Sequence, residues 1–180
     1  MLLAPLAAQA EGFGVPALMA ELASVRSGQA HFTERRTMAL TPEPLQSQGF
    51  LRYWAPDRLE KQTLAPTPGD LLIEGDMVTV SQAGQPTRSI SLRATPELAA
   101  LVSGLRATMA GDLATLQRYY TLRLQGEAAD WQLDLVPLDQ RMKAVVAGIR
   151  ISGSGATLRR VVTEEAGGDR SEMLITPDAP

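Results

Sequence analysis

Closely spaced turns divide this sequence into many short segments, and that spacing constrains the fold more than any other feature. Glycine-containing pairs such as Gly75-Asp76 and Gly167-Gly168 separate segments that are rich in strand-forming residues. Strands this short, joined by tight turns, favour an antiparallel meander. A break is expected over residues 41–44, which contain two prolines. We predict ten or eleven strands, at residues 31–40, 50–54, 58–64, 71–74, 77–81, 87–93, 121–125, 131–136, 144–152, 157–165 and 170–176.

The apolar period changes to a helical one in two regions. The first helix should span about residues 15–27, with Pro16 at its first position and Gly28 as its stop. The second should begin after Thr95, and a third, short helix restarts after Gly111-Asp112. The predicted fold class is therefore α+β, a curled antiparallel sheet covered by about three helices. Such a sheet encloses an apolar space, and periodicity leaves open whether that space is filled or hollow.

The composition excludes several classes of function. The chain has 180 residues, a net charge of −3 and no cysteine. The length suits one domain, and the acidic balance argues against a nucleic-acid partner. Without cysteine there is no disulfide, thiolate nucleophile or Cys-ligated zinc. No stretch has the roughly 18 uncharged apolar residues of a membrane span.

The first ten residues resemble the end of a secretory signal peptide. They are apolar and finish in Ala8-Gln9-Ala10, which has the form of an A-x-A cleavage site. We therefore predict residues 1–10 as a signal-peptide remnant and residues 11–180 as a single mature domain in the periplasm. An ordinary apolar N-terminal arm is the alternative.

No set of residues in the sequence has the pattern of an active site. His31 is the only histidine, and no nucleophile motif accompanies it. We therefore predict no catalytic residue, no metal and no cofactor. The basic pairs could meet an anionic headgroup, although outward surface charge is the simpler interpretation. The charged pairs interpreted as turn or surface residues are Glu74/Asp76, Glu164/Glu165, Arg35/Arg36 and Arg159/Arg160.

Four motifs occur along the chain in a characteristic order. They are the strand Ala30-His31-Phe32-Thr33-Glu34, the strand–Pro–strand run from Gly49 to Lys61, the hairpin Leu72-Ile73-Glu74-Gly75-Asp76, and the polar turn Gly168-Asp169-Arg170-Ser171. In this order, and with helix, meander, two helices and meander around them, they resemble the LolA family of periplasmic outer-membrane lipoprotein carriers. The resemblance covers most of residues 15–177.

The resemblance implies an unclosed half β-barrel with a helical lid over an apolar cavity. Proteins of this kind shelter a lipid or the acyl chains of a lipoprotein and carry them towards the outer membrane, between an inner-membrane donor and an outer-membrane acceptor. We expect a monomer without enzymatic activity. In the lipoprotein carriers an arginine that bonds to the lid precedes the signature proline; here Ala55 occupies that position. Lid closure is then expected to depend on apolar contact, on Arg52 or on Arg58.

The candidate lipid-binding residues lie at inward strand positions and on the lid faces, with plain core packing as the alternative for each. From the strands they are Leu51, Tyr53, Leu59, Ile73, Val78, Val80, Ile90, Leu92, Trp131, Leu133 and Leu135; from the helices they are Leu98, Leu101, Val102, Leu105 and Met109. A non-carrying periplasmic sensor or adaptor on the same scaffold is the alternative function, and it would fill the pocket with bulky side chains.

Overall fold

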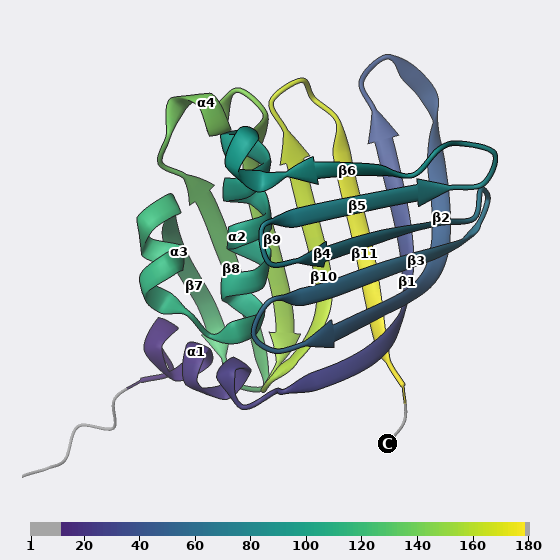
Figure 1. The fold of residues 1–180 in the computed structure, drawn as a ribbon. Coiled ribbons are helices and arrows are strands. Elements are labelled where there is room, and N and C mark those ends of the chain that lie inside the picture. The colour runs from purple at the N-terminus through teal and green to yellow at the C-terminus, as the bar shows by residue number, and fades with distance from the viewer. Residues whose placement is uncertain (1–11, 179–180) are drawn as a thin grey trace, which may run out of the picture.

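Each turn returns the chain against the strand before it, and the result is one large, strongly curved antiparallel sheet (Figure 1). The computed structural model describes residues 12–178, so the predicted signal remnant lies outside the described residues. The strands are β1 (Ser27–Met38), β2 (Thr41–Trp54), β3 (Arg58–Ala65), β4 (Gly69–Glu74), β5 (Met77–Gln82), β6 (Arg88–Ser91), β7 (Tyr120–Glu127), β8 (Asp130–Pro137), β9 (Val146–Ser154), β10 (Thr157–Glu165) and β11 (Arg170–Pro177). The helices are α1 (Val15–Ala23), α2 (Pro96–Ala110), α3 (Leu113–Tyr119), α4 (Gln140–Lys143) and the 3₁₀ turn η1 (Leu92–Ala94).

The strand order is β6-β5-β4-β3-β2-β1-β11-β10-β9-β8-β7, so β6 and β7 are the edges and the sheet is not closed. Strand β1 is central because it pairs with β2 on one side and with the last strand, β11, on the other. Figure 1 shows β3–β6 running across the direction of β9–β11 and facing them, with α2 between these two arms. The predicted curled antiparallel sheet of the α+β class is confirmed.

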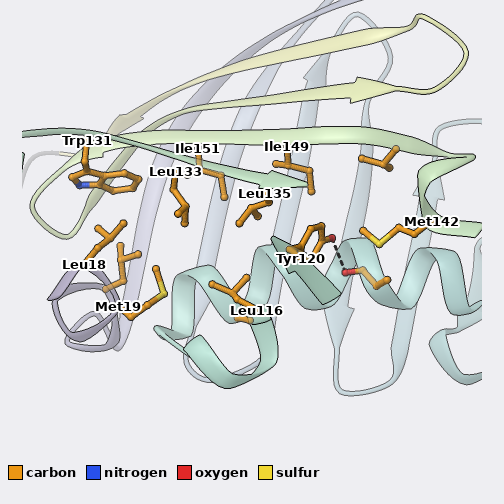
Figure 2. Packing of buried hydrophobic residues seen from close by; sticks show 14 residues of the cluster. Leu18, Met19, Leu116, Tyr120, Trp131, Leu133, Leu135, Met142, Ile149 and Ile151 are labelled. Carbon is orange, nitrogen blue, oxygen red and sulfur yellow. Dashed lines mark hydrogen bonds between the residues drawn. The ribbon is translucent and has the colours of Figure 1, made fainter. Parts of the chain in front are cut away.

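One half of the concave side is solid. Buried side chains from α1, α3 and β7–β9 interlock there, and Figure 2 shows them meeting between sheet and helices. Tyr120 lies at the centre of this contact, and its hydroxyl donates a hydrogen bond to the Ala100 carbonyl of α2 (3.0 Å). The side chains labelled in Figure 2 are Leu18, Met19, Leu116, Tyr120, Trp131, Leu133, Leu135, Met142, Ile149 and Ile151.

A smaller apolar cluster lies on the other side of α2. Ile73 and Val78 of the β4–β5 hairpin are buried there against Val102 of α2 and Leu92 of η1. Helix α2 is thus held between two clusters that belong to opposite arms of the sheet. Helix α2 therefore covers the space between the two arms of the sheet.

Several predicted boundaries were wrong. Helix α1 ends at Ala23 and not near residue 27, because Ser27 is already paired with Trp54 in the sheet. Strand β2 begins at Thr41 and runs through the two prolines that were expected to break it. Strand β3 pairs with β2 only from Gln48 onwards, so the missing proline N–H groups interrupt no β2–β3 hydrogen bonds. The short helix α4 was not predicted; Asp139 caps it by accepting hydrogen bonds from the Arg141 and Met142 amides.

Candidate functional site

A cavity of about 520 Å³ lies between α2 and the concave face of the sheet. Its walls come from both arms: β1–β5 on one side and β9–β11 on the other. Because side chains alternate across a strand, every second residue of β2, β3 and β4 points into this space. The cavity falls in the range of about 300–1,000 Å³ that is usual for small-molecule sites.

Helix α2 forms the roof. Leu101, Leu105 and Met109 project from it into the cavity, while Ala100, Ala107 and Gly104 turn towards the solid core. The apolar residues that predicted this helix thus face two places, the cavity on one side and the solid core on the other. These leucine and methionine side chains form an apolar surface that excludes water and carries no reactive group.

One polar contact fastens the roof to the β4–β5 hairpin, on the side of α2 away from the Tyr120–Ala100 hydrogen bond. Arg106 Nη1 donates a hydrogen bond to the backbone carbonyl of Gly75, in the β4–β5 turn, at 2.6 Å. The expectation that Arg52 or Arg58 holds the lid was wrong. Arg52 pairs with Glu60 (2.8 Å) and Arg58 with Glu74 (2.9 Å), both within the sheet. The arginine that ties the roof to the wall is therefore on helix α2, and not on β2 or β3.

The family model described as "Outer membrane lipoprotein carrier protein LolA-like" matches residues 7–179. The chain belongs to this LolA-like family. That assignment confirms the resemblance seen in the motifs. A comparison with curated protein sequences finds no significant match.

Three solved structures with a similar fold are distant from this LolA-like protein in sequence. A LolA superfamily protein from Nitrosomonas europaea is 12% identical, covers 94% of this chain and 96% of its own, and gives a TM-score of 0.46. A DUF1329 family protein from Desulfovibrio piger is 11% identical over 90% and 88%, with a TM-score of 0.47. MucB of Pseudomonas aeruginosa, solved in complex with MucA, is 14% identical over 92% of this chain and 57% of its own, with a TM-score of 0.43. These TM-scores lie below 0.5, so the family assignment depends on the sequence match.

Ten of the sixteen residues predicted to bind lipid line the cavity of this LolA-like protein. Those ten are Leu51, Tyr53, Leu59, Ile73, Val78, Leu98, Leu101, Val102, Leu105 and Met109. Whether they contact a lipid stays a prediction, but the fold does bring them to one space.

The other six lie elsewhere. Trp131, Leu133 and Leu135 face the concave side as predicted, yet they are at most 1% exposed because α1 and α3 pack directly on them. Val80 and Leu92 belong to the small cluster beside α2, and Ile90 is partly exposed on the edge strand β6. The inward direction was right for β8, but alternation cannot indicate which helix covers a strand.

Sequence reasoning missed the part of the lining contributed by the last two strands. Leu158 and Val161 of β10 and Met173 and Ile175 of β11 line the cavity. The signal was present as alternation: Met173 and Ile175 point one way, and their neighbours Glu172 and Leu174 the other. These residues make the cavity a space shared by both ends of the chain.

Several of the charged residues that were interpreted as surface residues form ion pairs in the structure, and so does His31. His31, which is 60% exposed, lies 2.8 Å from Asp178 through Nδ1. Glu165 accepts a hydrogen bond from Arg36 at 2.8 Å, and Asp76 accepts one from Arg93 at 2.6 Å. Among the residues described, no three His, Asp or Glu side chains are placed to hold a metal ion. None of the described helices is long and apolar enough to cross a membrane.

Two polar groups among the cavity residues were not predicted. Lys61 of β3 and Glu34 of β1 form an ion pair across β2, beside the cavity. Burial raises the pKa of Glu34, but hydrogen bonds from Lys61, Ser171 and Ser47 and the charge of Lys61 outweigh it, so the pKa is lowered. Strand alternation could have indicated that Lys61 points inward, because it lies two residues from Leu59, on the same face of β3, and opposite Leu51 of β2. Lysine is rarely buried without a partner, so a lysine at an inward position indicates that an acidic group lies nearby.

Proposed function

We propose that this LolA-like protein shelters a lipid or an acyl chain in the cavity beneath α2 and carries it towards the outer membrane. The observation that supports this most directly is an apolar hollow of about 520 Å³ that draws its lining from both arms of the sheet. A fold stabilised only by packing would gain by filling that volume. The hollow is therefore the feature that a carrier needs and a purely structural domain does not.

The energetics favour a hydrocarbon cargo. Exposing an acyl chain to water costs about 0.8 kcal/mol for each CH₂ group. Leucine, isoleucine and methionine side chains offer the chain dispersion contacts in place of water. Because the cost accumulates along the chain, a cavity that covers ten or more methylenes makes aqueous transfer feasible.

We place the working compartment in the periplasm, with residues 11–180 as the mature domain and the protein acting as a monomer. The cargo would come from an inner-membrane donor and pass to an outer-membrane acceptor. Transfer needs α2 to move away from the β4–β5 hairpin, and the Arg106–Gly75 hydrogen bond is the polar contact between these two elements that such movement breaks. No chemical step is assigned, because the lining acts by shape and by excluding water.

The alternative is a sensor or adaptor that carries nothing. That function would suit a filled concave face, which is what β7–β9 present against α1 and α3. The hollow between α2 and the two arms favours the carrier. A ligand-binding experiment separates the two.

The test is displacement of a fluorescent apolar probe, N-phenyl-1-naphthylamine, by palmitate-derived lipids, with native mass spectrometry of protein purified without detergent. Leu51→Trp would fill part of the cavity and should weaken lipid binding at least about tenfold. Leu174→Trp is the matched control, because Leu174 is 50% exposed and is not among the cavity residues. Absence of bound lipid together with absence of displacement would support the adaptor.

A further inference from the structure

The cavity is apolar along most of its length but has one polar end. Gly28, Gln29, Ala30 and Glu34 of β1 line the cavity, and about 20 Å of strand separates the first from the last. The wall is apolar at the α1 end, where Leu22 and Ile151 lie. At the other end Glu34, Lys61 and Ser171 line the space together.

The polar end is built, and not a chance meeting of surface charges. Only 17% of the Glu34 side chain and 26% of the Lys61 side chain are exposed. The Lys61 ammonium lies over the ring of Phe32, 4.9 Å from its centroid. Gly49 makes this possible, because a Cβ at that position would stand 3.0 Å from the Phe32 ring and 1.8 Å from the Gln62 carbonyl oxygen.

The hydrogen-bonding capacity of the two partners is unequal. Glu34 accepts from Lys61 and Ser47 on one oxygen and from Ser171 on the other. An ammonium has three N–H groups, and Glu34 is the one acceptor found for Lys61 among the side chains described. Lys61 therefore has two N–H groups left to donate to a ligand at this end of the cavity.

The charge at this end is balanced. Lys61 and Glu34 neutralise each other, so a ligand carboxylate would add an uncompensated negative charge a few ångströms from Glu34, in a partly desolvated place. A carbonyl oxygen accepts the same hydrogen bond without adding charge. Ester and amide carbonyls stand at the head of acyl chains, where the hydrocarbon begins.

We infer that the cavity selects acyl chains by their ester or amide carbonyl, with Lys61 as the donor and Glu34 as the positioning residue that holds the ammonium and balances its charge. The chain then extends from Lys61 along β1 towards α1. This inference rests on the proposed carrier function, and it adds the class of head group and the direction of the chain.

The experiment compares monopalmitoylglycerol with hexadecylglycerol ether as competitors for the bound N-phenyl-1-naphthylamine. The two differ in a single carbonyl, and we expect the ester to bind about tenfold more tightly to the wild type, as for a hydrogen bond to a charged donor. Lys61→Met should lower the affinity for the ester to that for the ether and leave the ether unchanged. The double variant Glu34→Gln/Lys61→Gln should do the same without an unpaired carboxylate. Lys143→Met, at an exposed position of α4, is the matched control and should keep the preference.

A third ligand tests the charge balance. Palmitate should bind the wild type more weakly than the ester, and Glu34→Gln should raise the affinity for palmitate several-fold, because Lys61 then has a free positive charge. Equal affinity for ester and ether in the wild type would refute the inference and leave the carrier function standing. Tightest wild-type binding by palmitate would also refute it. If no lipid displaced the probe, the carrier function itself would be lost.

Discussion

Gly104 of α2 lies directly against the ring of Tyr120, and nothing larger than glycine fits between them. A Cβ at position 104 would stand 2.6 Å from the Tyr120 hydroxyl oxygen and 2.7 Å from Cε2. The same hydroxyl donates to the Ala100 carbonyl, one turn earlier in α2. The pair therefore sets how closely the roof helix approaches β7, and so how wide the cavity is on its other side.

Replacing Gly104 with alanine should destabilise the protein by about 1–2 kcal/mol, because overpacking against a rigid ring exceeds the gain in helix propensity. Urea unfolding followed by circular dichroism measures this. Gly167→Ala is the control, since a Cβ at Gly167 meets nothing within 4 Å. Equal stability of the wild type and Gly104→Ala would mean that α2 is not fixed by this contact.

Arg106→Leu should loosen the roof without unfolding the protein. The lost hydrogen bond to Gly75 has a charged donor, and for a partly exposed group we expect about a tenfold larger open population. Faster hydrogen exchange in residues 96–110 and faster release of a bound probe would show it. Arg93→Leu is the control, because the Arg93 side chain is 84% exposed and forms only a surface ion pair with Asp76. Hydrogen exchange in residues 96–110 should not change in this variant. Identical exchange in Arg106→Leu and the wild type would contradict the role of the tie.

The solid and hollow halves of the concave face should respond differently to truncation. Leu133 is fully buried in the core, so Leu133→Ala should cost about 2–5 kcal/mol in free energy of unfolding. Leu51 faces a space that is already empty, and Leu51→Ala should cost less than about 1.5 kcal/mol. Equal losses would mean that the cavity collapses in solution. Denaturant unfolding of both variants gives the comparison, and lipid affinity should change only for Leu51→Ala.

Stability should depend on pH through Glu34. Its pKa is lowered in the folded protein, so its contribution is complete above the ordinary glutamate value near 4.5 and is lost as the pH falls through the lowered value. The difference in unfolding free energy between wild type and Glu34→Gln should therefore be largest at neutral pH and shrink below about pH 4.5. Urea titrations at several pH values between neutrality and pH 3 measure it. A difference that stays constant over this range would show that Glu34 is not held ionised by its partners.

The sequence predicted well those features that depend on neighbours along the chain. The β4–β5 hairpin forms at Gly75, whose φ of 54° is the left-handed conformation that glycine favours. Helix α2 begins at Pro96, as its N-terminal signals indicated, and β10 has the predicted bounds. The long β2 was missed because the cost of proline depends on whether a partner strand needs its N–H, which local sequence does not reveal.

The site was predicted in part for the same reason. Alternation correctly identified Leu51, Leu59 and Ile73 as inward, but it identified Leu133 as inward with equal strength. Only the packing of α1 and α3 decides which inward residues meet a helix and which meet a void. The ion pair of Glu34 with Lys61 spans three strands, and pairing at that distance follows from the register of the sheet and not from either motif.

The pairing of β1 with β11 determines how late in synthesis the cavity can be completed. The floor of the cavity is assembled from the first strand and the last, and Glu34 accepts one of its hydrogen bonds from Ser171, which is 137 positions further along the chain. Until β11 has left the ribosome and paired with β1, the pocket lacks one wall. Under the proposed carrier function, a chain that is still being synthesised would therefore be unable to take up a lipid.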